Sequence, residues 1–424
     1  MSIIETISKK MTLKRRMILL LICLVLILLT IFSLTFRDKL GLNLFTRFLT
    51  YDNETANVTF AHNIRSEDLF VALDFKLLAC GETSLQLFSG TGSTLLQTQV
   101  AMENPAVGSN GKQAVVYDAG GHSLYVISKD KVAFPLELTE DQYILSATIN
   151  EAGWVAVTTK EDGYKGVVSI YNAEYELFGS IRLSSHYLRN AIVTPDCSGL
   201  YALSTAQSLG NYESRLLYYS FDQYRPVDEA EDTEEELVLL PPTIPDPNAP
   251  VVSEDEAPPA ETTPSAEDPV SQVALGNSVV LSMTATENRC WVLAEDALYI
   301  FLSSGELSQK YDFAGKYLKR ASLNGTDFAV LLLSQSATGN SGTIVTVDNE
   351  GAAIATKEFQ EPILDLTAAG RYLAILTPNG LQVFGKDLKE ISNSPVVQGV
   401  HSINLFPDGT LAQIMDENIR LYIP

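Results

Sequence analysis

The chain has 424 residues, a formal net charge of −23 and 46% hydrophobic residues. This composition supplies enough apolar side chains for a substantial core and excludes a wholly disordered protein. Outside the N-terminus no cluster of Lys and Arg provides the basic face that nucleic-acid binding requires, so we expect no nucleic-acid partner.

The first predicted element is a transmembrane helix. Residues 17–36 are uncharged and mainly apolar, and at about 1.5 Å per residue they are long enough to cross a hydrocarbon layer of about 30 Å. The basic tail 1–16 precedes them, which predicts a cytoplasmic N-terminus and an extracytoplasmic remainder. No Ala-x-Ala cleavage site follows, which favours a signal anchor over a cleaved signal peptide. We therefore expect a single-pass protein of the cell membrane that contacts the lipid bilayer through residues 17–36, with residues 37–54 as a juxtamembrane linker.

Eight related segments follow this linker. Each combines a short turn rich in Gly, Asn, Asp or Glu with four to six strand-forming residues, as in "TPDCSGLYALS" from Thr194 and "FPDGTLAQIM" from Phe406. The successive separations between segments are 36, 41, 46, 90, 38, 44 and 39 residues, so one separation departs from the rest. These separations are measured between the first residues after each turn: Lys76, Lys112, Gly153, Gly199, Arg289, Asp327, Arg371 and Thr410.

An acidic insertion accounts for the long separation. Residues 226–269 contain 14 Asp and Glu, 10 of the 18 prolines and no Lys or Arg, and without them the separation of 90 becomes 46. Such a segment cannot bury enough apolar surface to offset the cost of chain ordering, so a disordered loop is predicted. We interpret it as a tolerated excursion from a blade loop, with capture of a cationic partner or weak Ca²⁺ binding as alternatives.

A period of about 40 residues with four strand signals predicts a β-propeller, because a parallel β-helix repeats at roughly half that length and helical solenoids show 3.6-residue periodicity. The last repeat ends after three strands, and the strand-like run "NVTFAH" over residues 57–62 is left without a partner. We therefore predict an all-β propeller over residues 55–424 with eight blades, closed by this N-terminal strand. Seven blades are the alternative.

The sequence contains no recognisable catalytic or metal-binding motif. Nucleophile elbows, zinc-protease helices, phosphate loops and dinucleotide-binding glycine patterns are missing. We therefore predict no catalytic, cofactor-binding or metal-binding residue and no cofactor. The four histidines fall in different predicted loops or strand edges, where they are interpreted as surface or hydrogen-bonded residues: His62, His122, His186 and His401.

Two tryptophans and three cysteines are assigned structural roles. Trp154 and Trp291 occupy equivalent positions in two second strands and are interpreted as packing residues between blades. Cys80, Cys197 and Cys290 are odd in number and widely spaced, which favours buried free thiols over a disulfide framework. A bridge between Cys197 and Cys290 is the alternative.

The anchor segment 17–36 and repeats such as "TPDCSGLYAL" and "FPDGTLAQIM" resemble a bacterial family, domain of unknown function 5711, of membrane-anchored WD40-like propellers in Gram-positive lineages. The resemblance covers roughly residues 57–424. It implies a propeller in a Gram-positive bacterium and carries over no activity and no site residue.

We expect a membrane-anchored binding or scaffold module rather than an enzyme, with a protein or a cell-envelope polymer as ligand. The alternative is an envelope-acting hydrolase or lyase with carboxylates gathered at the central channel, which convergent carboxylates with raised pKa values would favour. A sensor is a third interpretation. It has little support because the tail 1–16 is too short for a signalling domain and residues 17–36 lack a charge and a Gly-x-x-x-Gly motif.

Overall fold

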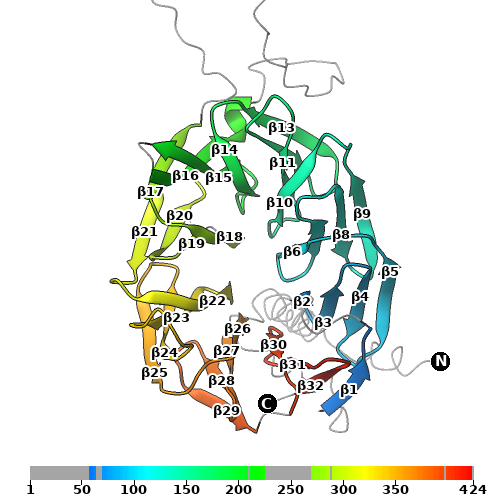
Figure 1. Ribbon diagram of the computed structural model, residues 1–424, viewed down its shortest axis with the longest axis vertical. Helices are drawn as coiled ribbons and strands as arrows, with labels where there is room; N and C mark the ends of the chain where they lie inside the picture. The colour runs from blue at the N-terminus through cyan, green and yellow to red at the C-terminus, as the bar shows by residue number, and fades with distance from the viewer. Residues whose placement is uncertain are drawn as a thin grey trace, which may run out of the picture.

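Eight four-stranded antiparallel sheets are arranged as blades around a central channel in the computed structural model (Figure 1). The predicted all-β fold is confirmed, with eight blades rather than seven. The only described helix is the 3₁₀ helix η1 (Phe221–Tyr224), and no helix among the described residues is long and apolar enough to span a membrane. The structure describes residues 57–63, 69–208, 211–224, 269–286, 289–395 and 398–422.

Several predictions from the sequence fall outside these ranges. They concern the tail 1–16, the transmembrane helix 17–36, the linker 37–54 and residues 226–268 of the insertion.

The first four blades follow the chain from the inner to the outer strand. Blade one consists of β2 (Leu69–Leu73), β3 (Lys76–Cys80), β4 (Ser84–Ser89) and β5 (Thr94–Gln99). Blade two consists of β6 (Pro105–Ser109), β7 (Ala114–Asp118), β8 (Ser123–Ser128) and β9 (Lys131–Glu137). Blade three consists of β10 (Tyr143–Ile149), β11 (Val155–Lys160), β12 (Gly166–Tyr171) and β13 (Leu177–Leu183). Blade four consists of β14 (Tyr187–Val193), β15 (Gly199–Ser208), β16 (Asn211–Ser220) and β17 (Ser271–Gly276).

The next three blades have the same order, and blade eight is built from both ends of the propeller. Blade five consists of β18 (Val280–Thr286), β19 (Arg289–Ala294), β20 (Ala297–Leu302) and β21 (Leu307–Asp312). Blade six consists of β22 (Tyr317–Gly325), β23 (Phe328–Ser334), β24 (Gly342–Asp348) and β25 (Ala353–Phe359). Blade seven consists of β26 (Asp365–Ala369), β27 (Tyr372–Leu376), β28 (Leu381–Gly385) and β29 (Glu390–Ser394). Blade eight consists of β30 (Ser402–Leu405), β31 (Leu411–Ile414), β32 (Asn418–Tyr422) and β1 (Asn57–Ala61).

The strand β1 closes the ring, as predicted from the missing outer strand of the last repeat. It pairs antiparallel with β32 from Asn57 opposite Tyr422 to Ala61 opposite Asn418. The closure is reinforced by packing, because the rings of Phe60 and Phe88 lie 4.9 Å apart between blades eight and one. Pairing β1 with β32 removes the exposed sheet edge that three strands would leave.

The core is distributed around the ring. Eight clusters of buried hydrophobic residues each lie at one boundary between neighbouring blades. The predicted packing of the tryptophans between blades is confirmed: Trp291 is 3% exposed between blades five and six, and Trp154 packs against Phe178 and Phe221. Their predicted equivalence is wrong, since Trp154 precedes β11 whereas Trp291 is the third residue of β19.

All three described cysteines are free. Cys80 and Cys290 are buried in the core, as predicted, whereas Cys197 is half-buried in the turn before β15. The Asn150 side chain donates a hydrogen bond to the Cys197 sulfur at 3.3 Å. The alternative bridge between Cys197 and Cys290 is therefore not formed.

Different strand ends and turns lie at the two ends of the central channel. Because each blade has four antiparallel strands, all eight inner strands run in the same direction and begin at one end, which we call the mouth. The turns between first and second strands and the connections to the outer strands lie at the opposite end. The end of β16 with η1, the start of β17 and the first residue of β1 are also at that opposite end, and the insertion stands between η1 and β17 in the sequence.

Candidate functional site

Four consecutive blades share an irregularity in their inner strand. In blades three to six, one residue of the inner strand has no partner in the second strand. The residues before and after it pair with two consecutive residues of that second strand. The other four blades pair their first two strands without such an insertion. A β-bulge of this kind bends the strand and re-aims a side chain. The extra residues are Leu145, Arg189, Leu281 and Lys319.

Large apolar side chains are exposed beside these bulges. Tyr143, Tyr187 and Tyr317 are the first residues of their inner strands and are 41%, 59% and 50% exposed. Leu145 and Leu281 are 37% and 55% exposed. Because inner strands begin at the mouth, these side chains all lie at that end of the channel. We call the following residues the mouth site: Tyr143, Leu145, Tyr187, Arg189, Leu281, Tyr317 and Lys319.

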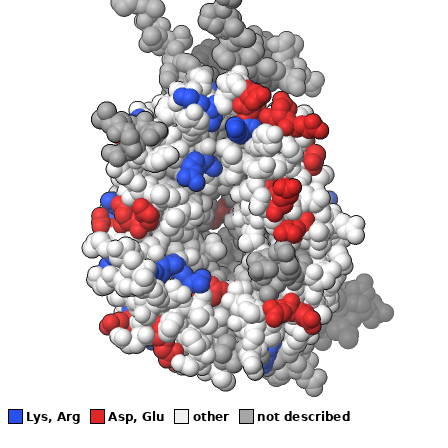
Figure 2. Space-filling model, in the orientation of Figure 1, with Lys and Arg blue, Asp and Glu red and all other residues white. Residues whose placement is uncertain are grey.

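Two of the four bulge residues are positively charged. Arg189 is exposed, and no ion pair joins it to a carboxylate in the described ranges. The Lys319 ammonium donates a hydrogen bond to the Ala337 carbonyl at 2.6 Å and lies 5.9 Å from the Tyr317 ring centroid. One face of the disc is hollowed at its centre, and Lys and Arg side chains border the hollow next to blades four and six (Figure 2). The mouth site thus alternates apolar and positive side chains from blade three to blade six.

More polar groups lie at the junction of blades three and four. The Lys165 ammonium lies 5.3 Å from the Tyr187 ring centroid and donates a hydrogen bond to the Ser185 carbonyl at 3.3 Å. The Ser185 hydroxyl and His186 Nδ1 are 2.7 Å apart. Burial lowers the pKa of His186 below its usual 6.5, and the positive charges of Arg215 and Lys165 lower it further.

Carboxylates are scarce in the described strands that surround the channel. Asp365 is the one acidic residue in the eight inner strands. Burial raises its pKa, although hydrogen bonds donated by the backbone of Ile403 and Leu366 and the charge of Arg320, 3.4 Å away, act in the opposite direction. Asp365 of blade seven thus contacts blades six and eight, and as the single acid of the described inner strands it does not provide the carboxylate pair that the hydrolase alternative needs.

The four histidines occupy separate places, as predicted, and each has a local partner. His62 contacts the Met415 carbonyl at 2.9 Å, His122 the Gln142 carbonyl at 2.7 Å, and His401 the Asp416 carboxylate at 2.9 Å. No group of three or more His, Cys, Asp or Glu within the described ranges is arranged to hold a metal ion.

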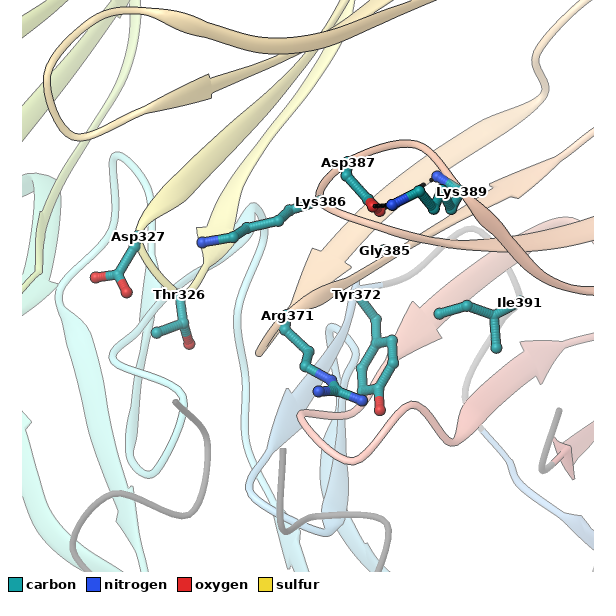
Figure 3. Close-up of a pocket in the computed structure, with 9 residues that line it drawn as sticks. All are labelled: Thr326, Asp327, Arg371, Tyr372, Gly385, Lys386, Asp387, Lys389 and Ile391. Carbon is teal, nitrogen blue, oxygen red and sulfur yellow. Dashed lines mark hydrogen bonds and ion pairs between the residues drawn. The ribbon is translucent and has the colours of Figure 1, made fainter. Parts of the chain in front are cut away.

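A pocket of about 440 Å³ lies at the opposite end, between blades six and seven (Figure 3). Its charged groups do not converge on one point. Lys389 pairs with Asp387 at 2.7 Å, and the Arg371 guanidinium lies over the Tyr372 ring. Lys386 extends away from them, towards Asp327 (Figure 3). A binding site usually brings a few polar groups to one point. We therefore regard the mouth site, rather than this pocket, as the candidate functional site.

Comparison with known proteins agrees with this architecture. Residues 49–237 match the family of unknown function DUF5711. The family resemblance inferred from the sequence is thereby confirmed for this part of the chain. No curated protein matches the sequence.

Solved propellers share the fold. The C-terminal WD40 domain of Sif2 matches with a TM-score of 0.51 and 10% identity, covering 85% of this chain and 99% of that domain. BamB from Moraxella catarrhalis matches with a TM-score of 0.44 and 11% identity over 86% of this chain and 98% of its own. The streptogramin B lyase matches with a TM-score of 0.45 and 10% identity over 87% and 97%. At 10% identity the likeness to the Sif2 domain shows the fold alone.

Sequence reasoning predicted no site residue, and the mouth site was missed. Three of its members share a signal that a comparison of the repeats contains, because Tyr143, Tyr187 and Tyr317 each begin an inner strand. The bulges had no such signal, since they depend on the register between two strands.

Proposed function

We propose that this protein is a membrane-anchored extracytoplasmic binding module that holds a protein ligand at the mouth site. The observation that carries the proposal is the repeated bulge of blades three to six, which places two leucines, the exposed Arg189 and the half-buried Lys319 beside three exposed tyrosines. Keeping large apolar side chains in water is unfavourable, and a ligand that covers them offsets this cost. Tyrosine and arginine are also the residue types that dominate protein interfaces.

A protein ligand fits this surface better than a polymer of neutral sugars. The cations at Arg189 and Lys319 alternate with Leu145 and Leu281, so a complementary surface presents carboxylates between apolar side chains. Polypeptides readily provide both kinds of group in one segment. We propose that binding, and not catalysis, is the activity, because the described inner strands contain one acidic residue, Asp365, and therefore no carboxylate pair.

The anchored position is part of the proposal. It is supported by the uncharged segment 17–36 and by the excess of positive charge before it. The first residue of β1 lies at the end opposite the mouth, which supports an anchor on that side of the disc.

Co-isolation from the native envelope tests the proposed function. We expect full-length protein, chemically crosslinked in intact cells, to yield one stoichiometric protein partner. The double variant Arg189→Glu, Leu281→Asp reverses one charge and makes one apolar position anionic at the mouth, and should reduce recovery of that partner at least tenfold.

A matched variant on an outer strand controls for charge and polarity. Arg182→Glu with Leu177→Asp makes the same two changes on β13, where Leu177 is 60% exposed. This variant should recover the partner as wild type does. An equal loss of partner recovery in both variants, or no loss in either, contradicts the assignment of binding to the mouth site. Glycan turnover by the purified protein would instead support a hydrolase.

A further inference from the structure

The loop between blades three and four brings three polar groups together beside the mouth site. Ser185 and His186 occupy the connection between β13 and β14, and Lys165 comes from the loop between β11 and β12. The Lys165 ammonium donates a hydrogen bond to the Ser185 carbonyl, and the Ser185 hydroxyl lies 2.7 Å from His186 Nδ1. We call Lys165, Ser185 and His186 the junction cluster.

We propose that the junction cluster is an anion subsite that binds a carboxylate of an acidic polypeptide ligand. This inference rests on the proposed binding function of the adjacent mouth site. It adds the chemical class of one ligand group and the residues that recognise it.

The cluster has donors available for an anion. An ammonium group has three N–H donors, and the hydrogen bond to the Ser185 carbonyl uses one of those of Lys165. In the Ser185–His186 pair, one group donates to the other in either tautomer. If the hydroxyl donates, the imidazole retains Nε2–H; if Nδ1–H donates, the hydroxyl proton is free. In both cases one donor remains for a carboxylate.

The charges around His186 favour an anion. The charged groups that act on it are Lys165 from the neighbouring loop and Arg215 from β16, both cations. The acids on these two elements are Glu213, which is paired with Arg215 at 2.7 Å, and Glu161 and Asp162 in the loop that carries Lys165, where Glu161 accepts a hydrogen bond from the Thr159 hydroxyl. Ser185 and Tyr187, on either side of His186 in the chain, are uncharged. A carboxylate placed here lies near the two cations that act on His186, and Tyr187 connects the cluster to the apolar part of the mouth site.

The chemistry predicts a pH dependence. Burial and the two cations keep the His186 pKa below 6.5, so the imidazole is neutral at pH 7 and gains a proton only in acid. A bound carboxylate favours the protonated form. Affinity for an anionic ligand should therefore increase as the pH falls below 6.5, while affinity for a neutral ligand should not.

Two synthetic peptides test the subsite on full-length protein in detergent micelles. One labelled peptide alternates leucine with glutamate, and its neutral counterpart alternates leucine with glutamine. By fluorescence anisotropy at pH 7 and low salt, we expect the glutamate peptide to bind more tightly. Lys165→Gln should weaken only the glutamate peptide, by about two- to fivefold, as expected for an exposed charge pair. His186→Gln should abolish the increase in its affinity below pH 6.5.

A matched control and a second variant separate this inference from the proposed function. Lys316 precedes Tyr317 as His186 precedes Tyr187, so Lys316→Gln removes a charge from an equivalent loop and should leave both affinities unchanged. Leu281→Asp should weaken both peptides. If Lys165→Gln leaves the difference between the peptides unaltered, or if neither peptide binds, the anion subsite is contradicted. Loss of the co-isolated partner in the mouth variants would still support the proposed function.

Discussion

Closure of the ring by β1 can be tested by truncating Phe60 to alanine. The Phe60 side chain is half-buried at the boundary of blades eight and one, and its ring packs against Phe88 and against the backbone of Gly92. Truncating a fully buried Phe costs about 3–5 kcal/mol, so a half-buried one should cost about 2 kcal/mol. With an unfolding entropy of about 2.1 cal/mol/K per residue, this loss lowers the Tm of a propeller of this size by roughly 3 °C.

Differential scanning calorimetry of the full-length protein measures this shift. Thr59→Val is the matched control, because Thr59 is an exposed residue of the same strand and valine is also β-branched. Its Tm should stay within about 1 °C of wild type. An unchanged Tm for Phe60→Ala would refute the account of ring closure, since β1 would then contribute no packing to blade eight.

Two further predictions concern buried groups. Burial raises the pKa of Asp365 above 3.8, so just above this pH the folded protein retains a proton on Asp365 that the unfolded chain has released. The free energy of unfolding therefore decreases as the pH rises above 3.8. Denaturant unfolding between pH 4 and 6 should show this decrease in wild type and not in Asp365→Asn, and the same slope in both would contradict it. Burial also raises the pKa values of Cys197 and Cys290, and Cys80 and Cys290 are buried. A thiol reagent should therefore modify Cys197 slowly in the native protein and Cys80 and Cys290 only after denaturation, as peptide mass spectrometry would show; rapid labelling of Cys290 would argue against the packing of blades four and five.

Much of the architecture could be predicted because a propeller repeats one local pattern. Each turn rich in Gly, Asn or Asp is followed by a buried second strand, so the predicted first residues fall within two residues of the observed ones, as at Gly153 before β11 and Arg371 before β27. The closing strand was predictable for a related reason. A sheet that ends after three strands leaves an unpaired edge, and residues 57–62 had the pattern of a strand without a partner.

The candidate site could not be predicted in the same way. Leu145 and Leu281 are apolar residues in apolar strands, and the sequence pattern alone assigns them to the core. The register with the second strand turns them outwards, and that register depends on pairing rather than on periodicity. The junction cluster combines Lys165 with His186 from a different loop, and only the packing of two blades brings these residues together.

Site-specific photo-crosslinking tests the central claim most directly. A benzophenone amino acid placed at Leu281 in the mouth site, or at Leu177 on the outer strand β13, has comparable exposure in the two positions. Irradiation of intact cells that carry each full-length variant should link one partner protein to the Leu281 position and none to the Leu177 position. The same products from both positions, or a partner captured only at Leu177, would contradict a ligand-binding mouth.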